Sequence, residues 1–190
     1  MFAISWGGAC AAETYRFDLR AGSSSIAAGL HHKTYLDTGY LRVGGSGVYA
    51  DDDRIQYQWA SLDLTVGSDT LRPGFNCDVG LRGLLGSAED TGRKGDIGSF
   101  GFTIFAGYLF PPEVTGIPLE LFGGLTLSPE IMSFWDSENY REIKLGFGFR
   151  IIKNASLQLA YTNYRVDMKN TPDKWALNED AYQFGLVMRF

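Results

Sequence analysis

The stretch "AYQFGLVMRF", Ala181 to Phe190, alternates between two kinds of side chain. One face carries apolar and aromatic side chains, namely Tyr182, Phe184, Leu186, Met188 and Phe190. The other face carries small or polar ones, namely Gln183, Gly185, Val187 and Arg189. A period of two indicates a β-strand whose faces meet different environments. A soluble β-sandwich and a membrane barrel both contain such strands, so the rest of the chain decides between them.

The composition favours a folded sheet protein. Of the 190 residues, 45% are hydrophobic and 21% are charged, which is too apolar for a disordered chain and gives room for one large domain. No run approaches the roughly 18 apolar residues of a transmembrane helix. The chain has 24 Gly, 13 Phe, 10 Tyr and 4 Trp, a mixture that suits a sheet with aromatics on one face and glycines on the crowded face.

Charge and cysteine content exclude several function classes. A net charge of -5 and the lack of a basic stripe argue against a nucleic-acid partner. Cys10 and Cys77 are the two cysteines, too few for a zinc site; Cys77 reads as a small strand residue, with a disulfide to Cys10 as the alternative. We predict no metal, no cofactor and no catalytic residues, and therefore no enzyme.

The first residues, "MFAISWGGACAA", are similar to the end of a secretory signal. Apolar and small residues lead into Ala9-Cys10-Ala11, a small-x-small cleavage pattern, but the usual basic start is missing. Residues 1-12 are therefore either part of a signal segment that starts further upstream or a short apolar N-terminus. We expect residues 13-190 to form a single transmembrane β-barrel domain.

Ten segments after residue 13 alternate with period two and are bounded by Gly, Pro, Asp, Asn or Ser, as strands and turns are. They are 14-22, 25-31, 38-50, 55-67, 74-86, 98-110, 117-127, 139-151, 155-167 and 180-190. The predicted fold class is all-β, an antiparallel up-and-down transmembrane β-barrel of ten strands. Because residues 14-37 are short-stranded and glycine-rich, the alternative is eight strands plus an N-terminal hairpin.

The two faces of these strands differ in a way that fits a lipid side and a lumen. The face predicted to contact lipid includes Ile143, Leu145, Phe147, Phe149, Tyr182, Phe184, Leu186 and Met188. The opposite face mixes glycines with charges of both signs, and these predicted lumen charges are Arg16, Asp18, Arg20, Asp78, Arg82, Glu120, Glu142, Lys144 and Arg150. The polar face of a soluble sandwich would lie in water instead.

Segment 55-67 departs from this pattern. Ile55, Tyr57 and Trp59 share a face that continues as Ser61, Asp63 and Thr65. Either a bulge near Ala60 or aromatic side chains pointing into the mouth of the barrel would account for it.

Connection lengths alternate along the chain, as in a barrel with short periplasmic turns and long outer loops. Counted back from the C-terminus, connections 168-179, 128-138 and 87-97 are long, whereas 152-154, 111-116 and 68-73 are short. We therefore predict a bacterial outer-membrane barrel with Phe190 on the periplasmic side. A terminal strand ending in Phe resembles the signal read by the barrel assembly machinery, and the expected surroundings are outer-membrane lipid and lipopolysaccharide.

The last third of the chain resembles a known family. Residues 119-166 carry Ser128-Pro129-Glu130 in a loop, Tyr140-Arg141-Glu142 opening a strand, Asn154-Ala155-Ser156 in a short turn, and Tyr161 in the next strand. This pattern is similar to that of the YfaZ family of Gram-negative outer-membrane proteins, although the chain reads Ala160-Tyr161-Thr162 where the family has Gly-Tyr-Arg. The resemblance implies a β-barrel of the porin class.

Three further motifs have simpler explanations than a site. His31 and His32 lie near Ser23, Ser24 and Ser25, as in some lipid-acting outer-membrane enzymes, but an orienting acid and an oxyanion site are not evident. The acidic run in "ADDDR", Ala50 to Arg54, would suit Ca²⁺ or a lipopolysaccharide bridge, yet such runs are usually solvated turns. The "NAS" sequon in a tight turn is a chance match.

Two functions remain open for the lumen charges. Rings of charge select ions or small solutes in a pore, which predicts a small porin with a narrow, charge-lined lumen. Alternatively, mixed charges pair with one another and plug the barrel, because about eight strands leave room only for side chains and open channels need roughly sixteen. That second function is a non-transporting structural or surface-binding protein of the outer membrane.

Overall fold

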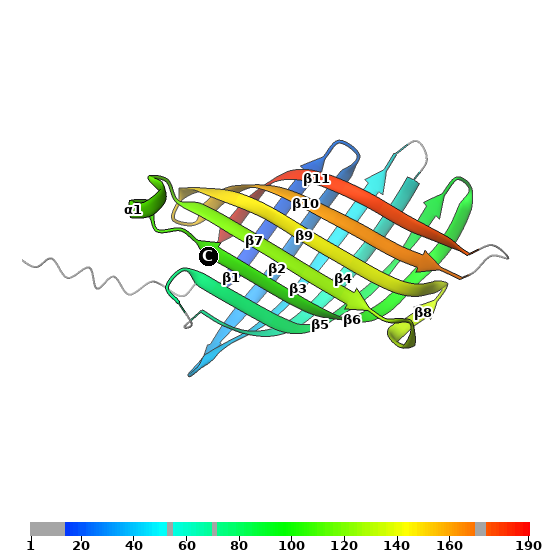
Figure 1. The fold of residues 1–190 in the computed structure, drawn as a ribbon, viewed down its shortest axis with the longest axis horizontal. Coiled ribbons are helices and arrows are strands. Elements are labelled where there is room, and N and C mark those ends of the chain that lie inside the picture. The colour runs from blue at the N-terminus through cyan, green and yellow to red at the C-terminus, as the bar shows by residue number, and fades with distance from the viewer. Residues whose placement is uncertain (1–13, 53–54, 70–71, 170–173) are drawn as a thin grey trace, which may run out of the picture.

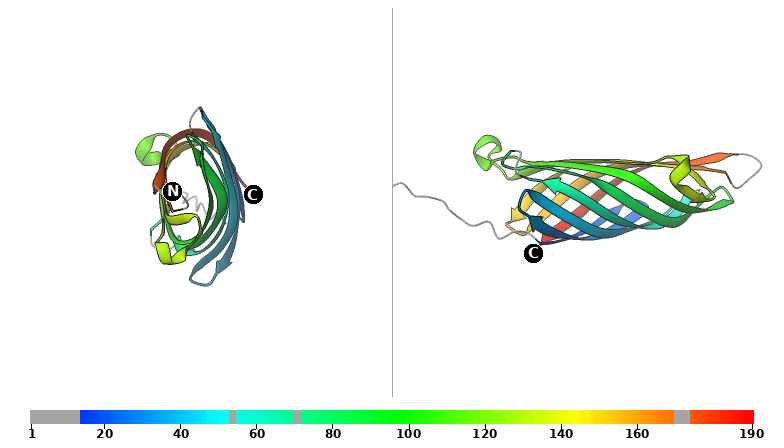
Figure 2. Two further views of the ribbon diagram at one scale, coloured as in Figure 1. Left: turned by 90° about the vertical axis from the view of Figure 1, so that its right-hand side faces the viewer. Right: turned by 90° about the horizontal axis from the view of Figure 1, so that it is seen from below.

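The computed structural model describes residues 14-52, 55-69, 72-169 and 174-190. Ten long antiparallel strands in this part of the chain close into a single barrel (Figure 1). Seen along its axis, the barrel is a closed ring (Figure 2). The predicted ten-stranded up-and-down barrel is confirmed, and the alternative of eight strands is not needed. The predicted signal segment 1-12 lies outside the described residues.

The long strands are 8 to 17 residues in length. They are β1 (Tyr15–Gly22), β2 (Ser25–Leu36), β3 (Gly39–Asp51), β4 (Ile55–Ser68), β5 (Phe75–Asp90), β6 (Arg93–Leu109), β7 (Leu119–Ser128), β9 (Ser137–Ile152), β10 (Ala155–Met168) and β11 (Trp175–Arg189). Three short elements lie in the connections: α1 (Pro112–Thr115), the 3-10 helix η1 (Glu130–Met132) and β8 (Ser133–Trp135). No helix among the described residues is long and apolar enough to cross a membrane.

The barrel closes between the first and last strands. β1 pairs with β11 from Arg16 opposite Arg189 to Gly22 opposite Gln183. Every other long strand pairs with its neighbours in the chain, and β7 pairs with β9 because β8 instead adds to the end of β6. The C-terminus and α1 lie at one end of the barrel, here called the terminal end, and the β5–β6 hairpin and β8 lie at the distal end (Figure 1).

The connections differ from those expected from sequence. Residues 87-97 form no long loop, because β5 and β6 continue to a two-residue turn at Thr91 and Gly92. Both residues have positive φ, at 48° and 80°, as a tight hairpin turn requires. The supposedly short connection after β6 holds α1. Connection length therefore does not distinguish the two ends of the barrel.

The structure of strand β4 explains why the face pattern of segment 55-67 differs from that of the other strands. Its register with β3 and β5 is continuous from Ile55 onward, so there is no bulge near Ala60. Tyr57 and Trp59 are buried and point inward together with Ser61, Asp63 and Thr65. The second explanation, aromatic side chains in the lumen, is the correct one.

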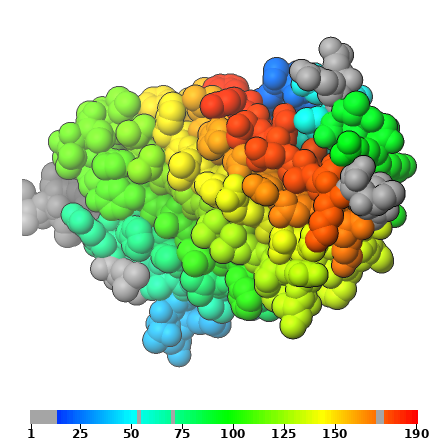
Figure 3. All heavy atoms as spheres, turned by 45° about the vertical axis from the view of Figure 1, so that its right-hand side comes forward, coloured from blue at the N-terminus to red at the C-terminus, as the bar shows by residue number. Residues whose placement is uncertain are grey.

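The outer surface of the barrel is largely apolar. Leu145, Phe147, Tyr182 and Phe184 are 51% to 69% exposed although their strands are paired on both sides. Figure 3 shows part of this surface over β9, β10 and β11, coloured yellow to red. Folding therefore leaves a broad apolar exterior and encloses the polar face.

Candidate functional site

The lumen has two halves with different chemistry. Toward the terminal end it holds mainly charged side chains, here called the charged half: Arg16, Asp18, Arg20, His31, Arg42, Asp63, Asp78, Arg82, Glu120, Glu142, Lys144, Arg150 and Arg189. Toward the distal end it is filled by the aromatic half, made of Tyr57, Trp59, Leu84, Ile97, Tyr140, Tyr164, Val166, Met168, Trp175 and Leu177. Strand alternation brings both sets inward, because every second residue of each strand faces the lumen.

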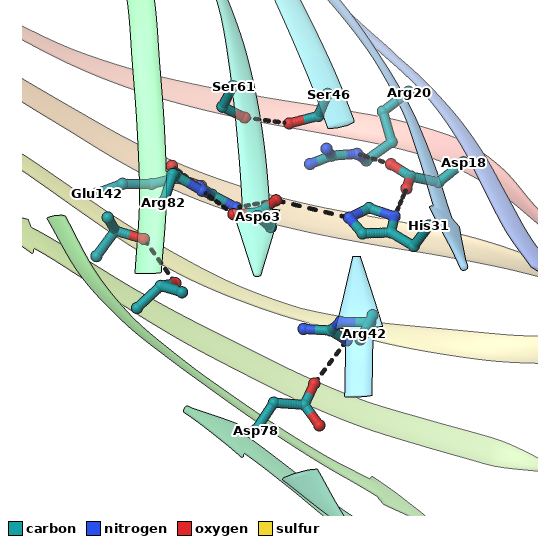
Figure 4. A network of polar contacts seen from close by, with 12 residues as sticks. Asp18, Arg20, His31, Arg42, Ser46, Ser61, Asp63, Asp78, Arg82 and Glu142 are labelled. Atoms are coloured by element: carbon teal, nitrogen blue, oxygen red, sulfur yellow. Dashed lines mark hydrogen bonds and ion pairs between the residues drawn. The ribbon is translucent and has the colours of Figure 1, made fainter. Parts of the chain in front are cut away.

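A chain of opposite charges crosses the charged half (Figure 4). Arg82 on β5 donates from Nε to Asp63 Oδ1 at 2.6 Å and from Nη1 to Glu142 Oε2 at 2.5 Å. Asp63 lies on the neighbouring strand β4, directly opposite Arg82 in register. Glu142 lies on β9, which is separated from β5 by β6 and β7 in the sheet. Arg82 therefore links two walls of the barrel through the lumen.

His31 on β2 continues this chain. Its Nε2 lies 3.7 Å from Asp63 Oδ2 and its Nδ1 lies 3.8 Å from Asp18 Oδ2. Asp18 in turn accepts a hydrogen bond from Arg20 Nε at 3.1 Å. The ring fits because Gly44 faces it across the β2–β3 pair, and a Cβ at Gly44 would overlap His31 Cδ2. The series thus runs from Glu142 through Arg82, Asp63 and His31 to Asp18 and Arg20.

Two further ion pairs lie nearer the terminal end. Arg42 Nη1 lies 2.6 Å from Asp78 Oδ2, and Tyr40 donates a short hydrogen bond to the other oxygen of Asp78. Arg189 Nη2 lies 2.6 Å from Glu120 Oε2, and its Nη1 donates to Ser156 Oγ at 2.6 Å. Like the crossing chain, each pair joins different strands and satisfies carboxylates that are almost fully buried.

Stacked rings close the aromatic half. The Tyr57 and Trp59 rings stack with centroids 4.5 Å apart, and Trp59 meets the Tyr164 ring edge-on at 5.0 Å. Trp59 also contacts Tyr140 edge-on at 6.3 Å, and the Tyr140 hydroxyl donates to Glu142 at 2.8 Å. Such offset and edge-on contacts between rings are favourable. Tyr140 therefore joins the two halves of the lumen.

The space that remains in the lumen is small and polar. One cavity of about 100 Å³ extends from Trp59 and Tyr164 down to Arg16 and Glu120. A second, of about 110 Å³, lies at the terminal end and shares residues with the first, including His31 and Asn76. The two cavities share lining residues, so they lie next to each other inside the charged half.

The structure brings all nine predicted lumen charges to the inner face. Eight of them line the two cavities, namely Arg16, Asp18, Arg20, Arg82, Glu120, Glu142, Lys144 and Arg150, and Asp78 pairs with Arg42 beside them. The eight residues predicted to contact lipid all lie on the outer face, where six are exposed and Ile143 and Met188 are partly buried.

Four central residues are missing from the predicted lumen charges: His31, Arg42, Asp63 and Arg189. Asp63 lies in the segment whose pattern departed from the rest, and Arg189 was read only as the polar face of the last strand. Each occupies the inward position of the alternation in its strand, so strict alternation combined with cross-strand register would have found them.

The remaining motifs form no site in the described part of the chain. His32 points away from His31, with its Nδ1 3.2 Å from the Thr14 carbonyl oxygen. Cys77 is a free thiol on the outer-facing side of β5. No group of three or more His, Cys, Asp or Glu side chains is arranged to hold a metal among the residues that the structure describes. Asp53 and Arg54 of the acidic run lie outside those residues.

Comparison with known proteins gives likenesses of fold. No model of a protein family matches the chain, and no curated protein matches it. Similar solved structures are the outer membrane channel DcaP of Acinetobacter baumannii (11% identity, TM-score 0.48, 91% of this chain and 54% of DcaP), the NanC porin (10%, 0.47, 93% and 98%) and the KdgM porin (9%, 0.42, 93% and 99%). The chain spans about half the length of DcaP. These likenesses describe the barrel and not its function.

Proposed function

We propose that the chain is a small porin of the bacterial outer membrane, similar to the YfaZ family, with a narrow, charge-lined lumen. The apolar exterior supports a membrane location, because soluble monomers rarely expose contiguous apolar patches above a few hundred Å². Here exposed side chains such as Leu81, Phe102, Phe147 and Phe184 belong to four different strands. The proposal includes assembly by the outer-membrane barrel machinery. The proposal includes no enzymatic activity.

One observation carries the porin function: two neighbouring polar cavities lie in the charged half, one at the terminal end and one that reaches Trp59. A solute entering at the terminal end would meet charged side chains along the whole charged half. It is stopped at the aromatic half, whose first layer is the group of rings around Trp59. Movement of side chains in the aromatic half would be needed to join the charged half to the distal end, so conduction would be small and intermittent.

Conductance in planar lipid bilayers tests this function. We expect the purified, folded protein to give small, brief current steps, and Trp59→Ala to give larger and longer ones because the largest ring lining the inner end of the cavity is removed. Neutralising Arg150 by Arg150→Gln would change the ion selectivity. Arg93→Gln is the matched control, since Arg93 is exposed in the β5–β6 hairpin away from the cavities.

A second function, a non-transporting barrel, is favoured by the crossing chain of charges. Arg82 bonds to both Asp63 and Glu142, and such cross-links hold opposite walls together. A silent bilayer with correctly folded protein, for both the wild type and Trp59→Ala, would contradict the porin and support this plugged barrel. A shift in electrophoretic mobility between unheated and heated samples shows that the protein was folded.

The membrane location has its own test. Leu145 is 55% exposed in the middle of β9, and placing an arginine on the lipid face of a barrel costs about 2 to 4 kcal/mol at the bilayer centre. We expect Leu145→Arg to reduce folding into lipid vesicles strongly. The control is Ile131→Arg in η1, where the side chain is 89% exposed outside the long strands. Equal folding of the two variants would contradict a lipid-facing role for Leu145.

A further inference from the structure

The cavity at the terminal end is lined by far more cationic than anionic groups. Five cationic side chains line it, namely Arg16, Lys33, Arg42, Arg150 and Arg189, together with His31. Glu120 is its one acidic lining residue among those that the structure describes. The whole chain carries a net charge of -5, so this local excess of positive charge opposes the overall balance.

Part of this positive charge is neutralised by nearby carboxylates. Arg189 pairs with Glu120, Arg42 pairs with Asp78, and Lys33 Nζ lies 3.7 Å from Asp69. Arg16 differs from these three. Within the described part of the chain it has neither a hydrogen bond nor an ion pair, and its Nε is a buried atom without a partner. A guanidinium that lines an enclosed cavity without a partner leaves its donors open to a ligand.

The register of the barrel seam adds a second observation. Arg16 on β1 lies directly opposite Arg189 on β11, and both face the lumen. Like charges directly opposite each other on paired strands are destabilising. Arg150 lies opposite Ser156 in the β9–β10 pair. The Ser156 hydroxyl accepts a hydrogen bond from Arg189. Three arginines of β1, β9 and β11 thus line one side of the same cavity, an arrangement that a bound anion would stabilise.

The cavity of about 100 Å³ that reaches Trp59 is also lined by more cationic than anionic side chains. Lys144 lines it together with Arg16, Arg20 and Arg82, and no hydrogen bond or ion pair involves Lys144 within the described residues. Asp18 and Glu142, also in its lining, already bond to Arg20 and Arg82. An anion that reaches Arg16 would therefore have a second cation, Lys144, further along the polar space.

We propose that the cavity at the terminal end binds a small oxyanion, a phosphate or a carboxylate, with Arg16 as its principal ligand and Arg150 and Arg189 beside it. Guanidinium groups suit this ligand because their planar donors match the oxygens of phosphates and carboxylates. A cavity of about 110 Å³ holds an anion of that size without its hydration shell. This binding goes beyond the porin function and does not depend on whether the lumen conducts.

The probe is inorganic phosphate, added to the folded full chain in detergent at constant ionic strength. A ligand that binds only the folded state raises the unfolding temperature with concentration. We expect phosphate to do so relative to chloride, and acetate to do so more weakly. Arg16→Gln should raise the dissociation constant about ten-fold or more, as loss of a charge-assisted hydrogen bond does. Arg93→Gln should keep the wild-type value.

Stability without phosphate separates binding from a structural role. If Arg16 serves to bind an anion and not to stabilise the barrel, Arg16→Gln removes a repulsion between Arg16 and Arg189. The variant should then unfold in chloride alone at the same temperature as the wild type or at a higher one. The proposal is overturned if phosphate and chloride have equal effects on the wild type, or if Arg16→Gln keeps the full phosphate effect. Neither measurement uses conductance, so failure here and failure of the porin function are distinguishable.

Discussion

The charged half and the aromatic half of the lumen fill the same barrel with opposite chemistry. In the charged half, few side chains reach across the barrel, and Asp63 and Glu142 share a single arginine, Arg82. In the aromatic half, Trp59 contacts three other rings, so its stabilisation is distributed. Removing one charged partner should therefore cost more than removing one ring, because a buried charge left unpaired has no substitute.

The largest effect is expected at Arg82. Arg82→Met keeps most of the side-chain volume but leaves Asp63 and Glu142 buried without their cation. Breaking a buried pair in this way costs about 3 to 5 kcal/mol. Urea unfolding from lipid vesicles, followed by tryptophan fluorescence, measures the loss. The triple variant with Asp63→Asn and Glu142→Gln should recover most of it, and a triple variant as unstable as Arg82→Met would contradict this account.

A smaller loss of unfolding free energy is expected for a substitution in the aromatic half. Trp59→Leu removes the stack with Tyr57 and the edge contact with Tyr164 but keeps an apolar filler. We expect a loss of about 2 to 3 kcal/mol in the same unfolding measurement, since truncating a buried ring costs contacts and leaves a cavity. Trp135→Leu, on the exposed side of β8, should change stability little. If Trp59→Leu lowers the free energy of unfolding more than Arg82→Met does, the proposed difference between the two halves is wrong.

The smallest of these effects concerns the space around His31. Gly44→Ala would place a Cβ against the His31 ring and push it away from Asp63, at a cost of about 1 to 2 kcal/mol for overpacking. Gly45→Ala is the matched control, because its Cβ would lie 3.4 Å from Leu62 Cδ2 on the outer face. Equal stability of the two alanine variants would show that the ring has room to move. Unfolding midpoints in urea decide between these outcomes.

Much of the fold follows from period-two alternation alone. The clean split between Ile143, Leu145 and Phe147 on one face and Glu142 and Lys144 on the other predicts the outer and inner surfaces of β9, because a strand must point successive side chains in opposite directions. The number of long strands follows from the same pattern and its turn residues. The length of the connections did not follow, because alternation in 87-97 is weak where β5 and β6 extend into a hairpin.

The candidate site could be predicted only in part. Sequence placed Arg82 and Glu142 on inner faces but could not pair them, since 60 residues separate them and the contact exists only because the barrel curves β5 toward β9. The register that sets Arg16 opposite Arg189 likewise arises when the last strand meets the first. Long-range partners depend on closure and shear of the sheet, which no local pattern encodes.

Gly146 shows the difference between what alternation predicts and what the folded barrel adds. Alternation determines that position 146 faces the lumen, and from sequence alone a small serine would be expected to fit there. In the folded barrel, a Cβ at Gly146 would overlap the Phe122 ring of the adjacent strand and lie 2.6 Å from the Leu159 carbonyl oxygen. The sequence by itself determined which way each side chain points, because that depends on backbone geometry. Only the tertiary structure decided how much room and which partner it finds, because both depend on the strands that closure brings beside it.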